Sequence, residues 1–168
     1  MTITVEDGTG LAAAVSYISV ADADAYFTAH DDPTAWSGLT TALKESALRY
    51  ATTSLDGLYS WVGVVATSTQ NLGWPRTGVW DEEGRKISGS IVPTRIEVAV
   101  CELALLHRTE ALNSNYSRGN SIRSERVGPI ETVFESGAQP DSAIPILRRI
   151  IMGLGKARYG ITGDLERA

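Results

Sequence analysis

Hydrophobic positions along the chain recur every three or four residues in four stretches, as they do on one face of an amphipathic helix. These stretches predict helices over residues 19–30, 40–57, 93–106 and 144–158. In the third stretch, residues 96–106 are apolar on almost every side. A helix of that kind is usually covered on most faces, so we expect it at the centre of the core.

Residues with strong positional preferences mark where the first three helices begin. Ser19 is followed by an acid at position 22, which is the pattern of a capping box. Thr40 or Thr41 can cap the second helix. Pro93 suits the first turn of the third helix, because its missing N–H would have no partner there.

Between the helices the hydrophobic pattern is shorter or absent. Residues 1–17 alternate polar and apolar positions, which indicates an extended arm that can include a strand. Residues 58–77 predict an irregular loop anchored by aromatic side chains, and residues 78–88 a hairpin that turns at 81–84. Residues 113–126 are polar and basic, as in a loop, and residues 127–134 predict a strand.

These elements together predict a mainly α fold: a small bundle of about four helices, with a short β-hairpin or strand and extended arms at both ends. The expected boundaries are an N-terminal arm over residues 1–16, a helical domain over 17–160 and a flexible tail over 161–168. A chain of 168 residues fits one domain, and it can bury enough surface to fold without a metal or a disulfide. Its single cysteine excludes an internal disulfide framework and a multi-cysteine zinc site.

The sequence shows no membrane or secretion signal. No run of eighteen apolar residues occurs, so no transmembrane helix and no membrane partner are expected. The N-terminus lacks a basic segment followed by an apolar one, so we also expect no secretory signal and synthesis in a reducing cytosol.

Charge is distributed unevenly along the chain. The net charge of −5 argues against a surface built as a whole to bind phosphates. Residues 1–84 hold eleven acids and three bases, a net charge of −8, whereas residues 85–168 hold nine acids and twelve bases, a net charge of +3. Such a division indicates an interaction between unlike surfaces, although chance placement on a solvated surface gives the same pattern.

No catalytic motif is present, and we predict neither an enzyme nor a bound cofactor. The only histidines, at positions 30 and 107, lie at or near predicted helix ends. Residues 153–156 read Gly-Leu-Gly-Lys, yet a phosphate loop would need glycine where Ile150 stands and Ser or Thr where Ala157 stands. We interpret these small residues as helix packing and Cys101 as a buried thiol without a catalytic role.

Two clusters of basic residues are the candidate binding groups. The polar loop contains Arg118, Arg123 and Arg126, and the last predicted helix contains Arg148, Arg149, Lys156 and Arg158. Both clusters suit an acidic partner or DNA phosphates, and both also suit an ordinary solvated face. The four tryptophans all lie between residues 36 and 80, in the acidic half, where anchoring of irregular backbone is a better interpretation than stacking on bases.

Several segments resemble a known family. The two specific ones are Tyr-Ile-Ser-Val-Ala-Asp-Ala at residues 17–23 and Trp-Pro-Arg-Thr-Gly at 74–78, and weaker similarities extend the match over most of residues 17–150. The weaker segments are residues 42–51, 91–93, 102–104 and 124–130. Together they resemble the head–tail connector proteins of tailed phages, also called adaptor or head completion proteins, whose members are often labelled DnaT-like single-stranded-DNA-binding proteins. The arm before residue 17 and the tail after residue 160 have no counterpart in this resemblance.

The resemblance implies a virion protein made in the bacterial cytoplasm. Such a subunit would form a ring, typically of twelve copies, beneath the portal protein, would extend the DNA channel, and would offer a platform to a tail or stopper protein. Contact with packaged DNA would be transient and non-specific. A single-stranded-DNA-binding protein, as the family label suggests, is the alternative.

The resemblance also suggests roles for the candidate residues, although it carries over no catalytic residue. The basic residues of the last helix and tail would contact the portal, and the arginines of the polar loop would face another subunit or the DNA channel. Trp74, Pro75 and Arg76 would act as a structural clamp, with the tryptophan buried, the proline fixing a turn and the arginine free for an ion pair.

Overall fold

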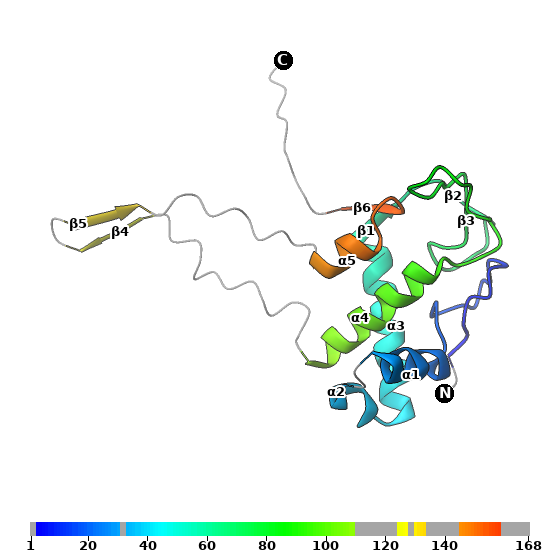
Figure 1. Cartoon of the computed structure of the whole chain (residues 1–168), viewed down its shortest axis with the longest axis horizontal. Helices are drawn as coiled ribbons and strands as arrows, with labels where there is room; N and C mark the ends of the chain where they lie inside the picture. Colours follow the sequence, from blue (N-terminus) through cyan, green and yellow to red (C-terminus); the bar gives the residue numbers. More distant parts are fainter. Residues whose placement is uncertain (1–2, 31–32, 110–123, 128–129, 134–144, 159–168) are drawn as a thin grey trace, which may run out of the picture.

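The protein folds around a small group of packed helices (Figure 1). This computed structural model describes residues 3–30, 33–109, 124–127, 130–133 and 145–158. The described residues form five helices and six short strands, and each sheet has only two strands, which confirms a mainly α fold. Within the described ranges, no helix is long and apolar enough to cross a membrane.

Local sequence signals account for the beginnings of the main helices. The Ser19 hydroxyl accepts the backbone N–H of Asp22, and the Thr40 hydroxyl accepts that of Leu43, as expected for N-caps. Pro93 lies directly before its helix. The helices are α1 (Val20–Ala29), α2 (Thr34–Ser37), α3 (Thr41–Leu58), α4 (Thr94–Thr109) and α5 (Pro145–Ile150).

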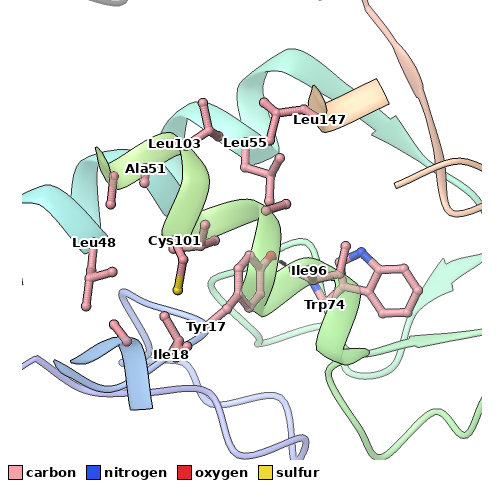
Figure 2. Close-up of a cluster of buried hydrophobic side chains, with 14 of the residues drawn as sticks. Tyr17, Ile18, Leu48, Ala51, Leu55, Trp74, Ile96, Cys101, Leu103 and Leu147 are labelled. Carbon is pink, nitrogen blue, oxygen red and sulfur yellow. Dashed lines mark hydrogen bonds between the residues drawn. The ribbon is translucent and has the colours of Figure 1, made fainter. Parts of the chain in front are cut away.

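Helices α3 and α4 pack against each other and form the centre of the core, as Figure 2 shows. The apolar run of α4 is buried as predicted, and α3 contributes a complementary apolar stripe. Complete burial of one such aliphatic side chain stabilises the fold by about 1.5–3 kcal/mol. Cys101 lies inside this core, and its burial raises the pKa of the thiol to about 12. The buried side chains of α3 and α4 are Ala47, Leu48, Ala51, Thr52, Leu55, Ile96, Ala99, Val100, Cys101, Leu103 and Ala104.

Residues 3–16 form a loop beside this core, with bends at 8–9 and a turn at 12–13, and the two ends of the loop are joined by backbone hydrogen bonds from Glu6 to Ser16 and from Val15 to Thr4. Ile3 is buried, and Val5 forms a parallel bridge with Ser16. The buried Glu6 carboxylate accepts the backbone N–H groups of residues 8, 10 and 11, which satisfies a charge that would otherwise be costly inside the fold. Gly8 has a φ of +98°, and a Cβ atom there would stand 2.2 Å from the Ser90 carbonyl oxygen.

The strands pair as three antiparallel two-stranded sheets. Their bounds are β1 (Tyr59–Trp61) with β6 (Gly155–Ala157), β2 (Val64–Val65) with β3 (Arg76–Thr77), and β4 (Ser124–Val127) with β5 (Ile130–Val133). The prediction of an irregular loop over residues 58–77 missed β1, β2 and β3. Strands of two or three residues are too short to show a hydrophobic period, and they form because they pair with other segments. The hairpin predicted at 78–88 is confirmed by the antiparallel bridge between Trp80 and Lys86.

The last predicted helix, over residues 144–158, is wrong after Ile150. Helix α5 ends at Ile150, and residues 155–157 form β6 against β1 instead of continuing the helix. Gly153 has a φ of +82°, which breaks the helix, and a Cβ atom on Gly155 would lie 2.8 Å from the Trp61 ring. The Gly-Leu-Gly-Lys segment is therefore a turn and the start of a strand, not a packed part of a helix.

The region around residue 127 is a hairpin, not a loop followed by one strand. Strands β4 and β5 pair antiparallel, from Ser124 with Val133 to Val127 with Ile130. The Gly-Pro dipeptide between them is a turn signal that the prediction placed inside a strand. The remainder of the predicted polar loop, residues 113–123, and the predicted C-terminal tail, residues 161–168, lie outside the described residues.

Candidate functional site

The segment around Trp74 is held by a partly buried carboxylate on α3, that of Asp56. Asp56 accepts three donors: the Tyr17 hydroxyl at 2.8 Å, the Trp61 indole N–H at 2.9 Å and the Gly73 backbone N–H at 2.9 Å. The Tyr17 oxygen also accepts the backbone N–H of Trp74 at 3.1 Å, a bond drawn in Figure 2. The two most specific sequence segments of the chain are thus joined through one side chain of α3.

Burial shifts the pKa values of both ionisable groups of this network upward. Burial raises the pKa of the Tyr17 phenol, and the charge of Asp56 raises it further, so the hydroxyl stays protonated and donates. Burial also raises the pKa of Asp56, while its hydrogen bonds from Gly73, Tyr17 and Trp61 act in the opposite direction. These hydrogen bonds oppose the effect of burial without cancelling it, so the pKa of Asp56 lies above its usual value.

Arg76 fastens the neighbouring loop through backbone oxygens. Its Nε donates to the Val62 carbonyl at 2.7 Å, Nη1 to that of Gly73 at 2.9 Å and Nη2 to that of Gly63 at 2.7 Å. The expectation that Arg76 would be free for an ion pair is therefore wrong, because its guanidinium is committed to three carbonyls. Next to it, Trp74 is fully buried and the Trp74–Pro75 peptide bond is cis.

The loop that Arg76 fastens presents apolar side chains to solvent. We call residues 62–66 together with 76–87 the β2–β3 lobe. Val64 is 66% exposed and Trp80 is 56% exposed, and Val62 and Val65 are also exposed. Large apolar side chains that gather on a rigid surface are a common feature of protein interaction sites.

A second apolar surface is the hollow between α4 and α5, which we call the α4–α5 groove. Its volume is about 140 Å³, and Ile146 at its edge is 49% exposed. A larger cleft of about 380 Å³, near the N-terminal segment, is acidic. Within that cleft, burial and the nearby charge of Asp22 raise the pKa of Glu97. The groove is lined by Glu102, Leu103, Leu105, Leu106, Thr109, Ile146 and Leu147; the carboxylates of the cleft are Glu6, Asp7, Asp22 and Glu97.

The structure only partly groups the basic residues predicted to bind a partner. Arg148 and Arg149 are exposed on α5, and Lys156 is exposed on β6. Arg158 follows β6, where its Nε donates to the Tyr59 carbonyl and its backbone N–H to that of residue 58. The four residues therefore come from a helix, a strand and the residue after that strand, not from one helix face.

The basic residues of the predicted polar loop fall mainly outside the described residues. Arg118 and Arg123 are not described, and Arg126 belongs to β4, where its Cα partner is Glu131. The assignment of Arg126 to a loop is wrong, because the hairpin begins at Ser124.

One aromatic surface escaped the prediction altogether. The rings of Tyr50 on α3 and His107 on α4 stack with their centroids 3.9 Å apart and an interplanar angle of 16°, and Arg49 and Arg108 are exposed next to them in the sequence. Burial, together with the charge of Arg108, lowers the pKa of His107. No linear pattern could show this pair, because the packing of two helices distant in sequence creates it. No group of three or more metal-ligating side chains occurs in the part of the chain that the structure describes.

These features define a small mainly α domain whose most specific motif supports an exposed lobe. The model of one protein family matches residues 1–168, the whole chain, and the chain belongs to this family, described as "Putative DnaT-like ssDNA binding protein". A search of the curated proteins and a search of the solved structures gave no match.

Proposed function

We propose that the protein is a structural head-to-tail connector of a tailed phage, which forms a ring beneath the portal, extends the DNA channel and provides the platform for tail attachment. One observation carries this proposal. The Trp-Pro-Arg motif does not shape a reactive pocket: its arginine binds three loop carbonyls and so holds an apolar lobe out to solvent. An exposed apolar lobe suits a subunit that binds other proteins.

The charge distribution supports a connector more than a strand-binding protein. The net charge is −5, and a described cleft collects four carboxylates. Tight strand binding needs a basic groove interleaved with aromatic rings. An acidic surface instead suits a channel through which DNA slides without being held, since like charges repel the phosphates.

We propose that the portal meets the C-terminal part of the body, through exposed Arg148 on α5 and Lys156 on β6. A tail or stopper protein binds the opposite end of the ring, and contact with packaged DNA is transient and non-specific. The mature location is the head–tail junction of the virion. The ring number of twelve rests on the family resemblance alone.

The test is binding to the portal protein of the same phage, measured by analytical ultracentrifugation of the two purified proteins. We expect co-sedimentation of wild type, and we expect Arg148→Glu combined with Lys156→Glu to weaken binding at least tenfold. Arg49→Glu, which reverses an exposed charge on α3, is the matched control and keeps wild-type binding. If wild type and the portal are both folded and do not bind, the connector function is wrong. If the double variant binds the portal as tightly as wild type does, the proposed portal face is wrong.

Single-stranded-DNA binding is the second candidate, and a specific observation favours it. Tyr50, which is 38% exposed, stacks on His107, and exposed arginines are their sequence neighbours at positions 49 and 108, so a nucleobase would find an aromatic ring and positive charge on the same two helices. One base stacked on an aromatic ring contributes about 1–3 kcal/mol. Fluorescence anisotropy with a labelled oligo-dT at low salt tests it: binding that Tyr50→Ala abolishes and that added salt weakens steeply supports this candidate, and no binding at micromolar protein excludes it.

A further inference from the structure

The two apolar surfaces of this chain lie at opposite ends of α4. The β2–β3 lobe is tied to the N-terminal end, because Glu82 in the lobe pairs at 2.8 Å with Arg95 in the first turn of the helix. The α4–α5 groove lies along the C-terminal half, from Glu102 to Thr109. A helix of 16 residues is about 24 Å long, so the surfaces are well separated. In Figure 1, β2 and β3 accordingly lie beyond the N-terminal end of α4.

The two surfaces also differ in shape. The lobe projects Val64 and Trp80 into solvent, whereas the groove is a hollow lined mainly by leucines with Ile146 at its edge. Its volume of about 140 Å³ is close to that of an apolar cavity known to accept benzene. The groove can therefore take one valine side chain or one aromatic ring.

The turn of the lobe and the rim of the groove differ in charge: residues 81–86 hold three acids and two bases, a net charge of −1, whereas exposed arginines stand beside the groove, whose lining also includes Glu102. The turn of the lobe contains Asp81, Glu82 and Glu83, and these three carboxylates share the guanidinium groups of Arg85 and Arg95. Beside the groove, exposed Arg108 follows Leu105 by three residues, and exposed Arg149 follows Ile146 by three residues. Residues three apart are neighbours on a helix, so both arginines can meet the carboxylates of an incoming lobe.

From these observations we infer that the β2–β3 lobe of one copy binds the α4–α5 groove of a second copy, head to tail. A surface that meets a different surface on the next copy leaves a free lobe at one end and a free groove at the other. Such a heterologous contact continues from copy to copy and closes into a ring where the rotation permits. The inference rests on the proposed function, because it assigns the surfaces through which connector subunits meet.

Two single variants that disable one surface each provide the test. Val64→Asp disables the lobe and leaves the groove intact, whereas Ile146→Asp disables the groove and leaves the lobe intact. We expect wild type to form oligomers larger than a dimer, each variant alone to be monomeric, and an equal mixture of the two to form a 1:1 dimer. Native mass spectrometry and sedimentation velocity at high protein concentration measure these states. Leu43→Asp, which changes an exposed apolar residue of α3 outside both surfaces, is the control and assembles like wild type.

Each alternative outcome overturns the inference. A mixture that stays monomeric while wild type assembles shows that the copies meet elsewhere, and so do single variants that assemble like wild type. Wild type that is monomeric at every concentration also overturns it. If Val64→Asp fails to fold, judged by thermal unfolding, Trp80→Ala replaces it as the lobe variant. The two proposals can fail separately. If wild type binds the portal but the mixture of the two variants stays monomeric, the connector function stands and the lobe–groove interface is wrong. If the copies assemble as expected but do not bind the portal, the interface stands and the connector function is wrong.

Discussion

Two fully buried tryptophans differ in what their indole N–H groups do. The Trp36 N–H donates at 2.7 Å to Asp24, which also binds the Lys44 ammonium and so joins α1, α2 and α3. The Trp74 N–H is buried without a hydrogen-bond partner among the described residues. Trp74 therefore stabilises the fold through packing, in an edge-on contact with Trp61, and not through its polar atom.

This difference predicts the effect of phenylalanine at each position. Because the two side chains are equally buried, Trp36→Phe and Trp74→Phe remove similar volumes, but only the first breaks a bond to a carboxylate. We expect Trp36→Phe to lower the free energy of unfolding by about 1–2 kcal/mol more than Trp74→Phe. Urea unfolding followed by circular dichroism measures this. Equal losses of unfolding free energy would show that Asp24 finds another donor in the Trp36 variant or that the Trp74 N–H has an acceptor.

His107 gives a pH dependence whose sign follows from its lowered pKa. Because burial and Arg108 disfavour the charged ring in the folded protein, protonation is easier in the unfolded chain. The free energy of unfolding should therefore fall as the pH drops from about 6.5 through the lowered folded-state pKa. His107→Phe, which keeps a ring against Tyr50, should remove the part of this fall that His107 causes. Urea titrations of both proteins between pH 5 and pH 8 test the prediction. An unchanged difference in stability across that range contradicts it.

At the scale of the elements, Gly63 and Gly78 allow a matched test of the β2–β3 lobe. Both have a φ of +74°, but a Cβ atom on Gly63 would lie 2.3 Å from the Thr77 carbonyl oxygen, whereas one on Gly78 would meet nothing within 4 Å. Gly78→Ala should cost about 1 kcal/mol for the left-handed backbone alone. Gly63→Ala should cost roughly 2–4 kcal/mol in total, because the strand pairing must shift. Thermal unfolding of both variants measures the difference, and equal costs would mean that the lobe yields freely.

Elements that depend on local signals were predictable from the sequence, and those that depend on distant pairing were not. The capping residues and apolar stripes of α1, α3 and α4 define these helices without reference to the remainder of the fold. Strands β1 and β6 exist only because they pair with each other across the chain. For the same reason the helical pattern after Ile150 was misleading: apolar spacing continues there, but the residues serve a turn and a strand.

The candidate site was predictable to a similar extent. The burial of Trp74 follows from its residue type and its place in an aromatic, irregular segment. The role of Arg76 does not, because its acceptors are backbone carbonyls that the sequence does not mark. The stack of Tyr50 on His107 needs the packing of α3 against α4, which no sequence period reports.

For the whole molecule, the division of charge acquires a spatial meaning. Most of the β2–β3 lobe, up to residue 84, belongs to the acidic half of the sequence, whereas its last residues, 85–87, and the whole α4–α5 groove belong to the basic half. Helix α4 separates the two surfaces, so unlike faces lie at opposite ends of one subunit, as a head-to-tail assembly requires. Net charge alone could not distinguish this arrangement from a uniformly acidic surface.

Electron microscopy of the purified protein mixed with the purified portal of the same genome tests the central claim most directly. If the protein is a connector, class averages will show an additional ring of density on the outer end of the portal, coaxial with its channel and absent from portal alone. Portal particles that remain unchanged at a large excess of folded protein would contradict the connector function. In that case, tight and salt-sensitive binding of the same preparation to oligo-dT would favour a single-stranded-DNA-binding protein.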